Sequence, residues 1–151
     1  MLLGRIYGQL MAIKLVDKQF ILAQGKQTII QNERSILEAC SGHPFITKLH
    51  LAFETSKYVA FIMEYCNGGE LFNLLRKVKK MKEADARFYF LETLSALEHL
   101  HSKGILYRDL KPENIILDSD GHVRLADFGL SKIIHESRTY SFCGSAEYMS
   151  P

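Results

Sequence analysis

The residues best suited to chemistry lie in two short polar runs in the second half of the chain. The first run supplies Arg108, Asp109, Lys111 and Asn114, and the second is Asp127-Phe128-Gly129. Together they offer a carboxylate that can accept a hydroxyl proton, a cation for a transferring phosphoryl group, and two oxygen ligands for a metal ion. Phosphoryl transfer needs few covalent groups and much positioned charge. The two runs therefore predict phosphoryl-transfer chemistry.

A long helix and a short hairpin are predicted on either side of the first run. Residues 83–103 have helical periodicity, with an apolar stripe made of Phe90, Leu94, Leu97 and His101. Residues 115–118 and 122–126 are predicted to form a hairpin around Ser119-Asp120-Gly121. Asp127 continues the alternation of this second strand, so we expect its side chain to point inward. An inward carboxylate needs a cation, and magnesium fits.

In the first half of the chain, two charged residues stand in apolar surroundings. Lys14 lies in a strand predicted at residues 9–16, and Glu33 lies in a helix predicted at residues 28–40. The helix face that carries Glu33 also contains Ile29, Leu37 and Cys40. A lone lysine near the start of a chain is more often simply solvated. Here, however, two opposite charges each lie in an apolar segment, where a charge is costly unless it is paired. We therefore predict an ion pair between Lys14 and Glu33 that holds Lys14 against nucleotide phosphates.

The elements between these halves complete an α+β pattern. Residues 48–54 and 58–65 are predicted to be paired strands, and the second is almost wholly apolar and so buried. Asn67-Gly68-Gly69 is a predicted turn, after which Glu70 opens a short helix that ends near Arg76-Lys77.

Composition narrows the class of protein. The chain has 151 residues, 47% of them hydrophobic, and a net charge of +2, which fits one globular domain and gives no reason to expect nucleic acid or a membrane surface as a partner. The basic run at residues 76–82 lacks interleaved aromatic residues and is interpreted as a solvated face. The three cysteines lack metal-ligand spacing and suggest free thiols. Without a signal sequence or an apolar span, a cytoplasmic or nuclear location is expected.

Taken together, these motifs resemble eukaryotic protein kinases of the AGC group of serine/threonine kinases, over the whole chain. Ala12-Ile13-Lys14 is similar to the strand-three lysine motif, and Glu33 to the helix-C glutamate. Met63-Glu64-Tyr65 and Gly68-Gly69-Glu70-Leu71-Phe72 are similar to the hinge and the start of helix D. Residues 138–151 resemble the activation segment, most closely that of the N-terminal domain of mitogen- and stress-activated and ribosomal S-six kinases.

The resemblance implies a role for each matching residue, with ATP and Mg²⁺ as cofactors. Asp109 and Lys111 would be catalytic, and Asn114 and Asp127 would hold the metal. The nucleotide would be bound by Lys14, Glu33, Glu64, Cys66 and Glu70. Ser141 would be the activating phosphosite with Arg108 as its partner, and Ser145, in the substrate loop, would offer a hydroxyl to Asp109 and Lys111.

The resemblance also implies a two-lobed fold, here expected as one partial domain. Residues 1–63 would form part of the N-lobe, 64–66 the hinge, and 67–151 the start of the C-lobe. The glycine-rich loop of the family has no match before Lys14, because Gly4-Arg5-Ile6-Tyr7-Gly8 departs from it and is interpreted as the turn into the next strand. The helices after the activation segment have no counterpart, so we expect an exposed apolar patch and little kinase activity from these residues alone.

Two functions from different classes follow. The first is a serine/threonine kinase that acts on protein substrates and is itself activated by an upstream kinase. The alternative is a catalytically dead, truncated kinase fragment that acts only as a binding or regulatory module. A small-molecule kinase ranks third, because residues 141–151 resemble a peptide-substrate activation segment.

Overall fold

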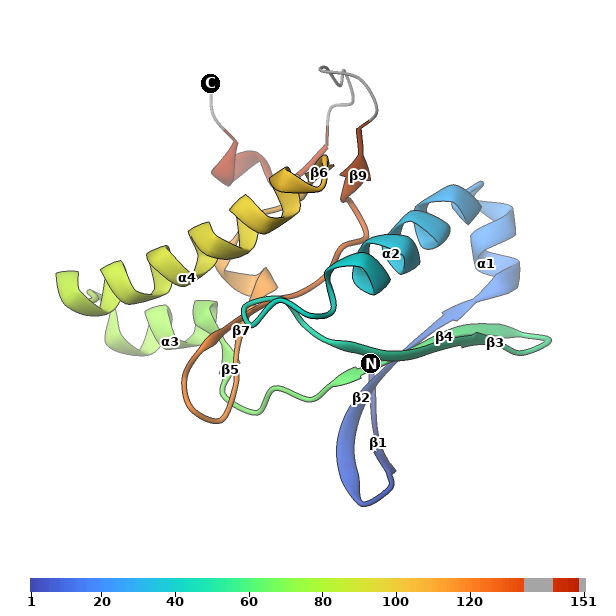
Figure 1. The fold of residues 1–151 in the computed structure, drawn as a ribbon, viewed down its shortest axis with the longest axis horizontal. Coiled ribbons are helices and arrows are strands. Elements are labelled where there is room, and N and C mark those ends of the chain that lie inside the picture. The colour runs from blue at the N-terminus through green and yellow to red at the C-terminus, as the bar shows by residue number, and fades with distance from the viewer. Residues whose placement is uncertain (135–142, 150–151) are drawn as a thin grey trace.

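The computed structural model describes residues 1–134 and 143–149. One end of the molecule is a four-stranded antiparallel sheet in the order β1-β2-β4-β3 (Figure 1). Its strands are β1 (Leu2–Ile6), β2 (Gln9–Asp17), β3 (Leu49–Glu54) and β4 (Tyr58–Glu64). Three of them were predicted, and β4 is buried along nearly all its length, as its apolar sequence indicated. Strand β1 was not predicted: Gly4, Arg5 and Ile6 pair with β2, and only Tyr7 and Gly8 form the turn.

Two helices lie on one side of this sheet, namely α1 (Lys18–Ala23) and α2 (Gln27–Cys40) (Figure 1). Helix α1, which directly follows β2, was not predicted from the sequence. Helix α1 begins because the Asp17 carboxylate accepts hydrogen bonds from the main-chain nitrogens of Gln19 and Phe20. Helix α2 was predicted, and its buried residues include Glu33, Leu37 and Cys40. Ile29 is 40% exposed, which corrects its place on the predicted buried face.

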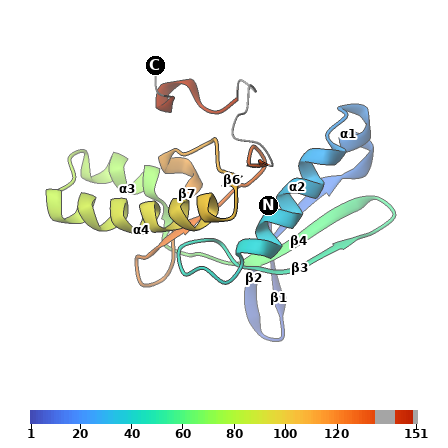
Figure 2. The ribbon, with the colours of Figure 1, turned by 45° about the horizontal axis from the view of Figure 1, so that its top comes forward.

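Helices α3 (Leu71–Val78) and α4 (Glu83–Ser102) make up the other end of the molecule (Figure 2). Two small sheets accompany them. The first has the order β5-β7-β8, with β5 (Gly69–Glu70), β7 (Ile115–Leu117) and β8 (Val123–Leu125). The second pairs β6 (Ile105–Leu106) with β9 (Lys132–Ile133), and single 3₁₀ turns occur at Pro112–Asn114 and Ala146–Tyr148. The β7–β8 hairpin was predicted, whereas the β6–β9 pair was not.

The buried face of α4 differs from the predicted stripe. Its buried residues are Glu92, Thr93, Ala96 and Leu100, whereas Phe90 is 63% and Leu94 38% exposed. On this face, Glu92 Oε2 accepts a hydrogen bond from the Val123 nitrogen of β8 at 2.8 Å. The expected exposed apolar patch is confirmed along α4, where Phe88 and Leu91 are also exposed.

One hydrophobic core runs through both ends of the molecule. It joins Ile36 and Leu37 of α2 and Phe61 of β4 to Leu100 of α4 and Leu125 of β8. The mixed α+β class predicted from the sequence is confirmed. The division into lobes at residues 64–66 stays a prediction.

Candidate active site

Strand β2 and helix α2 bring Lys14 and Glu33 together. The Lys14 Nζ lies 2.5 Å from Oε1 of Glu33, whose side chain is only 3% exposed. The predicted ion pair is therefore present. Lys14 Nζ also lies 3.5 Å from Oδ1 of Asp127, so three of the predicted site residues meet at one place. Such a cation, fixed by a buried carboxylate, suits the binding of phosphate groups.

The side chain of Asp127 does not point into the core, contrary to the prediction from strand alternation. It is 59% exposed, whereas Phe128 is 1% exposed and takes the buried position. The alternation fails because β8 ends at Leu125 and Asp127 adopts the left-handed conformation, with a φ of 54°. The carboxylate then faces Lys14, and its Oδ1 accepts a hydrogen bond from the Gly129 nitrogen at 3.3 Å.

Three side chains surround the carboxylate of Asp109. Its Oδ2 lies 2.8 Å from Lys111 Nζ and accepts a hydrogen bond from Asn114 Nδ2 at 2.9 Å, while Oδ1 accepts one from Ser145 Oγ at 2.8 Å. Burial alone raises the pKa of Asp109, but the hydrogen bonds from Lys111, Ser145 and Asn114 outweigh it and hold the pKa below its usual value. Asp109 is therefore an ionised hydrogen-bond acceptor at neutral pH.

Ser145 reaches this carboxylate because the preceding residue is a glycine. Gly144 has a φ of +115°, and a Cβ there would lie 2.6 Å from the carbonyl oxygen of Arg108. The Ser145 hydroxyl in turn accepts a hydrogen bond from Lys111 Nζ at 3.0 Å. The hydroxyl contact with both Asp109 and Lys111 that the resemblance implied is thus present.

Tyr107 anchors the loop that carries Asp109. Its hydroxyl donates a hydrogen bond to the carbonyl oxygen of Ala126, and its ring meets Phe128 edge-on, with the ring centroids 5.3 Å apart. Ser131 Oγ donates to the Tyr107 carbonyl oxygen at 3.1 Å. Burial raises the pKa of Tyr107 strongly, so its hydroxyl remains a donor. These contacts fix Asp109 relative to Asp127, and Ser131 was missed because a lone serine after Gly129 carries no sequence signal.

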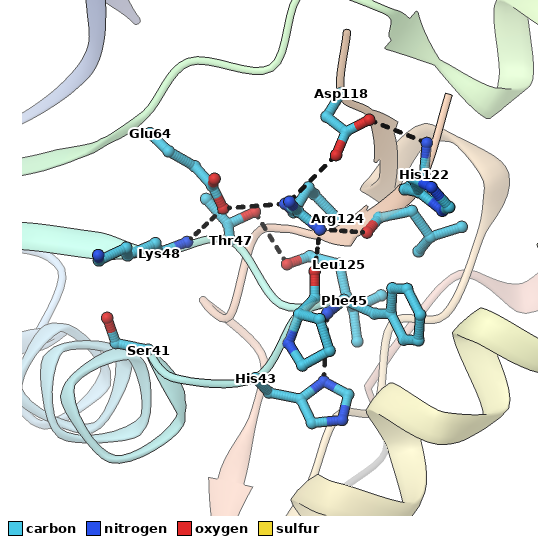
Figure 3. Close-up of polar contacts among 12 residues, drawn as sticks. Ser41, His43, Phe45, Thr47, Lys48, Glu64, Asp118, His122, Arg124 and Leu125 are labelled. Atoms are coloured by element: carbon cyan, nitrogen blue, oxygen red, sulfur yellow. Dashed lines mark hydrogen bonds and ion pairs between the residues drawn. The ribbon is translucent and has the colours of Figure 1, made fainter. Parts of the chain in front are cut away.

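The predicted hinge residues Glu64 and Cys66 make no described contact with Asp109, and Glu64 has partners of its own. The Glu64 carboxylate is engaged by Arg124 Nε at 3.3 Å and by the Lys48 nitrogen at 2.7 Å (Figure 3). Its Oε1 is therefore occupied by these two contacts. Burial raises the pKa of Cys66 to about 12, so its thiol stays protonated. Glu70 precedes α3 without a side-chain capping bond, and no described contact joins it to Lys14 or Asp109.

The guanidinium group of Arg108 lies beside the loop that carries Asp109. The φ of Arg108 is 68°, its Nε donates to the Leu130 carbonyl oxygen at 2.7 Å, and its buried Nη1 has no hydrogen-bond partner among the described residues. A buried, unsatisfied guanidinium nitrogen suits an anionic partner. The predicted phosphosite Ser141 lies outside the described residues.

Asn114 and Asp127 suit a magnesium ion. Asn114 uses its Nδ2 to donate to the Asp109 carbonyl oxygen and carboxylate, which leaves its amide oxygen as a ligand. Within residues 1–134 and 143–149, no group of three or more His, Cys, Asp or Glu side chains could hold a metal. Mg²⁺ usually takes one or two protein oxygens together with substrate phosphates and water. The pair fits a metal that arrives with a nucleotide.

No helix in the described part of the chain is long and apolar enough to cross a membrane. Cys40 and Cys66 are free thiols, as predicted.

The chain is similar to known proteins over nearly its whole length. A family model described as the protein kinase domain matches residues 3–151. Putative ribosomal protein S6 kinase alpha-1 of Caenorhabditis elegans is 50% identical over 98% of the chain, and ribosomal protein S6 kinase alpha-2 of Homo sapiens is 49% identical over 98%. Serine/threonine-protein kinase Sgk1 of Homo sapiens is 48% identical over 93% of the chain, and the matched region makes up 33% of that relative. The chain spans 19% and 20% of the length of the two ribosomal protein S6 kinases.

Proposed function

This chain belongs to the protein kinase family, and we propose that it transfers the γ-phosphoryl group of ATP to serine and threonine hydroxyls of proteins. The observation that carries the proposal is the convergence of Lys111, Asn114 and Ser145 on the Asp109 carboxylate. Residues from a loop, a 3₁₀ turn and a distant segment meet at one ionised group. That arrangement provides the positioned charge that phosphoryl transfer needs.

In this proposal each residue has one task. Asp109 orients the substrate hydroxyl and accepts its proton, since a carboxylate with a lowered pKa is ionised at neutral pH. Lys111 steadies the γ-phosphoryl group. Lys14, fixed by Glu33, holds the α- and β-phosphates.

Asn114 and Asp127 would hold magnesium, which neutralises phosphate charge when bound. The hinge at residues 64–66, between an N-lobe of residues 1–63 and a C-lobe from residue 67, would bind the base through its main chain. The Glu64 side chain would contribute little, because its Oε1 is already engaged by Arg124 and by the Lys48 nitrogen.

The acceptor class can be tested directly. Because the chain spans about a fifth of its S6 kinase relatives, the assay uses a chimaera in which ribosomal protein S6 kinase alpha-2 supplies the flanking segments of the kinase domain. Three peptides that differ only in a serine, threonine or tyrosine acceptor are incubated with labelled MgATP. We expect label in the serine and threonine peptides. MgATP binding without transfer to any peptide would contradict the proposal and favour the binding-module alternative.

Regulation by phosphorylation of Ser141 is the second part of the proposal. A phosphate there adds nearly two negative charges, and the unsatisfied Nη1 of Arg108 supports a bidentate arginine–phosphate pair. An upstream kinase would supply the phosphate. Ser141→Ala should lower activity, and Arg108→Ala should remove the response to phosphorylation. Full activity of Ser141→Ala would contradict this part.

A cytoplasmic or nuclear place of action, without nucleic-acid partners, stays a prediction.

A further inference from the structure

Arg124 joins three segments that are far apart in the sequence (Figure 3). Its Nε lies 3.3 Å from Oε1 of Glu64 at the end of β4, and its Nη2 lies 3.0 Å from Oδ2 of Asp118, directly after β7. Its Nη1 donates a hydrogen bond to the carbonyl oxygen of Pro44, in the loop between α2 and β3. One guanidinium group therefore connects the hinge, the β7–β8 hairpin and that loop.

Main-chain contacts hold the same loop from both sides. On the side of β8, the Leu125 nitrogen donates to the Phe45 carbonyl oxygen at 2.8 Å, and the Thr47 nitrogen donates to the Leu125 carbonyl oxygen at 3.0 Å. On the side of the hinge, the Lys48 nitrogen donates to Glu64 Oε1 at 2.7 Å, and the Glu64 nitrogen donates to the Lys48 carbonyl oxygen at 3.0 Å. Arg124, in β8, contacts Glu64 directly and so connects the two sides of this loop to each other.

The segment directly after the hinge also lies on the hairpin. The Gly68 nitrogen donates to the Leu117 carbonyl oxygen at 2.9 Å, and a Cβ at Gly68 would lie 2.5 Å from the Asp118 carbonyl oxygen. The chain can approach this closely only at a glycine. The hairpin that carries Arg124 thus contacts the chain on both sides of residues 65–66, through the Glu64 side chain before them and through the Gly68 main chain after them.

The same segment carries Asp127, three residues beyond Arg124. A nucleotide bound as proposed would span from the hinge main chain to Lys14 and Asp127, so its affinity depends on the relative position of those two ends. We propose that Arg124 is a positioning residue, which fixes the hinge relative to Asp127 and so sets the affinity for MgATP without contacting the nucleotide. This inference rests on the proposed function.

Arginine suits this role better than lysine. The planar guanidinium presents several fixed donors, and here they reach two carboxylates and a carbonyl oxygen at once. The side chain of Arg124 is 21% exposed, so solvent screens these ion pairs only in part. A lysine would place one charge among three acceptors and keep only part of the connection.

The test compares ligands that occupy one end of the nucleotide site with a ligand that spans it. Affinities for MgATP, for adenosine and for magnesium tripolyphosphate are measured on the wild-type chain, on Arg124→Met, Arg124→Lys and Glu64→Gln, and on the double variant of Arg124→Met with Glu64→Gln. The matched control is Arg34→Met, which removes an exposed arginine paired with Glu38 at 2.8 Å inside one helix. Hydrogen exchange at the Lys48 and Leu125 amides is followed in parallel.

We expect Arg124→Met to weaken MgATP binding about tenfold, with the adenosine and tripolyphosphate affinities within about twofold of wild type. Both amides should exchange faster, Arg124→Lys should be intermediate, and Glu64→Gln should add little to Arg124→Met. Equal losses for all three ligands with a lower Tm, or unchanged MgATP affinity and exchange, would overturn the inference. Because binding is measured, a protein that binds MgATP but transfers no phosphoryl group contradicts only the proposed function.

Discussion

The hydroxyl of Ser145 donates a hydrogen bond to Oδ1 of Asp109 at 2.8 Å and accepts one from Lys111 Nζ at 3.0 Å. The two partners of Ser145 are themselves 2.8 Å apart. A residue close to the C-terminal end therefore completes the hydrogen bonding of the loop that begins at Arg108. In the proposed function, the segment that would receive the substrate is thereby connected to the residue that would accept its proton.

Removing the Ser145 hydroxyl should weaken phosphoryl transfer. Ser145→Ala leaves Asp109 Oδ1 without this donor, and a hydrogen bond to a charged group is worth about 1.5–3 kcal/mol, so we expect kcat/KM to fall roughly tenfold to a hundredfold. Ser145→Thr keeps the hydroxyl and should retain most activity. Ser102→Ala, which removes an exposed hydroxyl bonded to the His99 carbonyl oxygen, is the control. Equal activity of Ser145→Ala and wild type would contradict the assigned role.

Gly144→Ala should displace Ser145. The substitution forces a side chain into the left-handed region and places its Cβ 2.6 Å from the Arg108 carbonyl oxygen. We expect a loss of about 1–3 kcal/mol in the free energy of unfolding, together with the transfer defect of Ser145→Ala. Gly121→Ala is the matched control, because its φ is +86° but nothing lies within 4 Å of the added atom. If both variants are equally stable in chemical denaturation, the close approach at Gly144 is not a constraint.

The Lys14–Glu33 pair should control nucleotide affinity. Glu33→Gln removes the charge that holds Lys14 while nearly preserving side-chain shape, so MgATP affinity should fall about tenfold. Lys14→Met should have a similar effect, and the double variant should lose less than the sum of the two. Glu38→Gln, in the exposed pair with Arg34, should bind MgATP like wild type. Titration calorimetry gives the MgATP affinity of wild type and of the four variants. If the losses of Glu33→Gln and Lys14→Met add up in the double variant, the two residues act separately.

The His122–Glu92 contact gives the stability a specific pH dependence. The hydrogen bond from His122 Nδ1 to Glu92 at 2.6 Å, strengthened by the carboxylate charge, raises the pKa of His122 above its usual value of 6.5. The pair therefore stabilises the fold fully below pH 6.5 and loses this contribution as pH rises through the folded-state pKa. We expect the Tm difference between wild type and His122→Asn to shrink from pH 6 toward pH 8.5. A difference that grows over this range would have the wrong sign.

The sequence predicted best where the local pattern and the tertiary fold agree. Strand β4, helix α2 and the β7–β8 hairpin are long or strongly patterned, and the Lys14–Glu33 pair follows because each charge contradicts its own surroundings. The predicted stripe of α4 was wrong at Phe90 and Leu94, because the helix instead buries the Glu92 carboxylate, which accepts hydrogen bonds from the Val123 nitrogen and the His122 side chain. Periodicity counts apolar residues and cannot anticipate such a partner.

The remaining differences have backbone or long-range causes. Strand alternation failed at Asp127 because the left-handed conformation there reverses the expected direction of its side chain. The short helix α1 depends on one capping carboxylate, Asp17. Arg124 gave no sequence signal, since two of its three partners, Glu64 and Pro44, lie on segments that only the fold brings to it.

The most direct test of the account is the separation of binding from transfer at Asp109. Asp109→Asn keeps the size and much of the hydrogen bonding of the side chain but cannot accept the proton of a hydroxyl. In the chimaera, we expect the rate of transfer to a serine peptide to fall at least about a thousandfold, while MgATP affinity stays within about twofold of wild type. Transfer that survives in Asp109→Asn at a comparable rate would contradict the assignment of Asp109 as the proton acceptor.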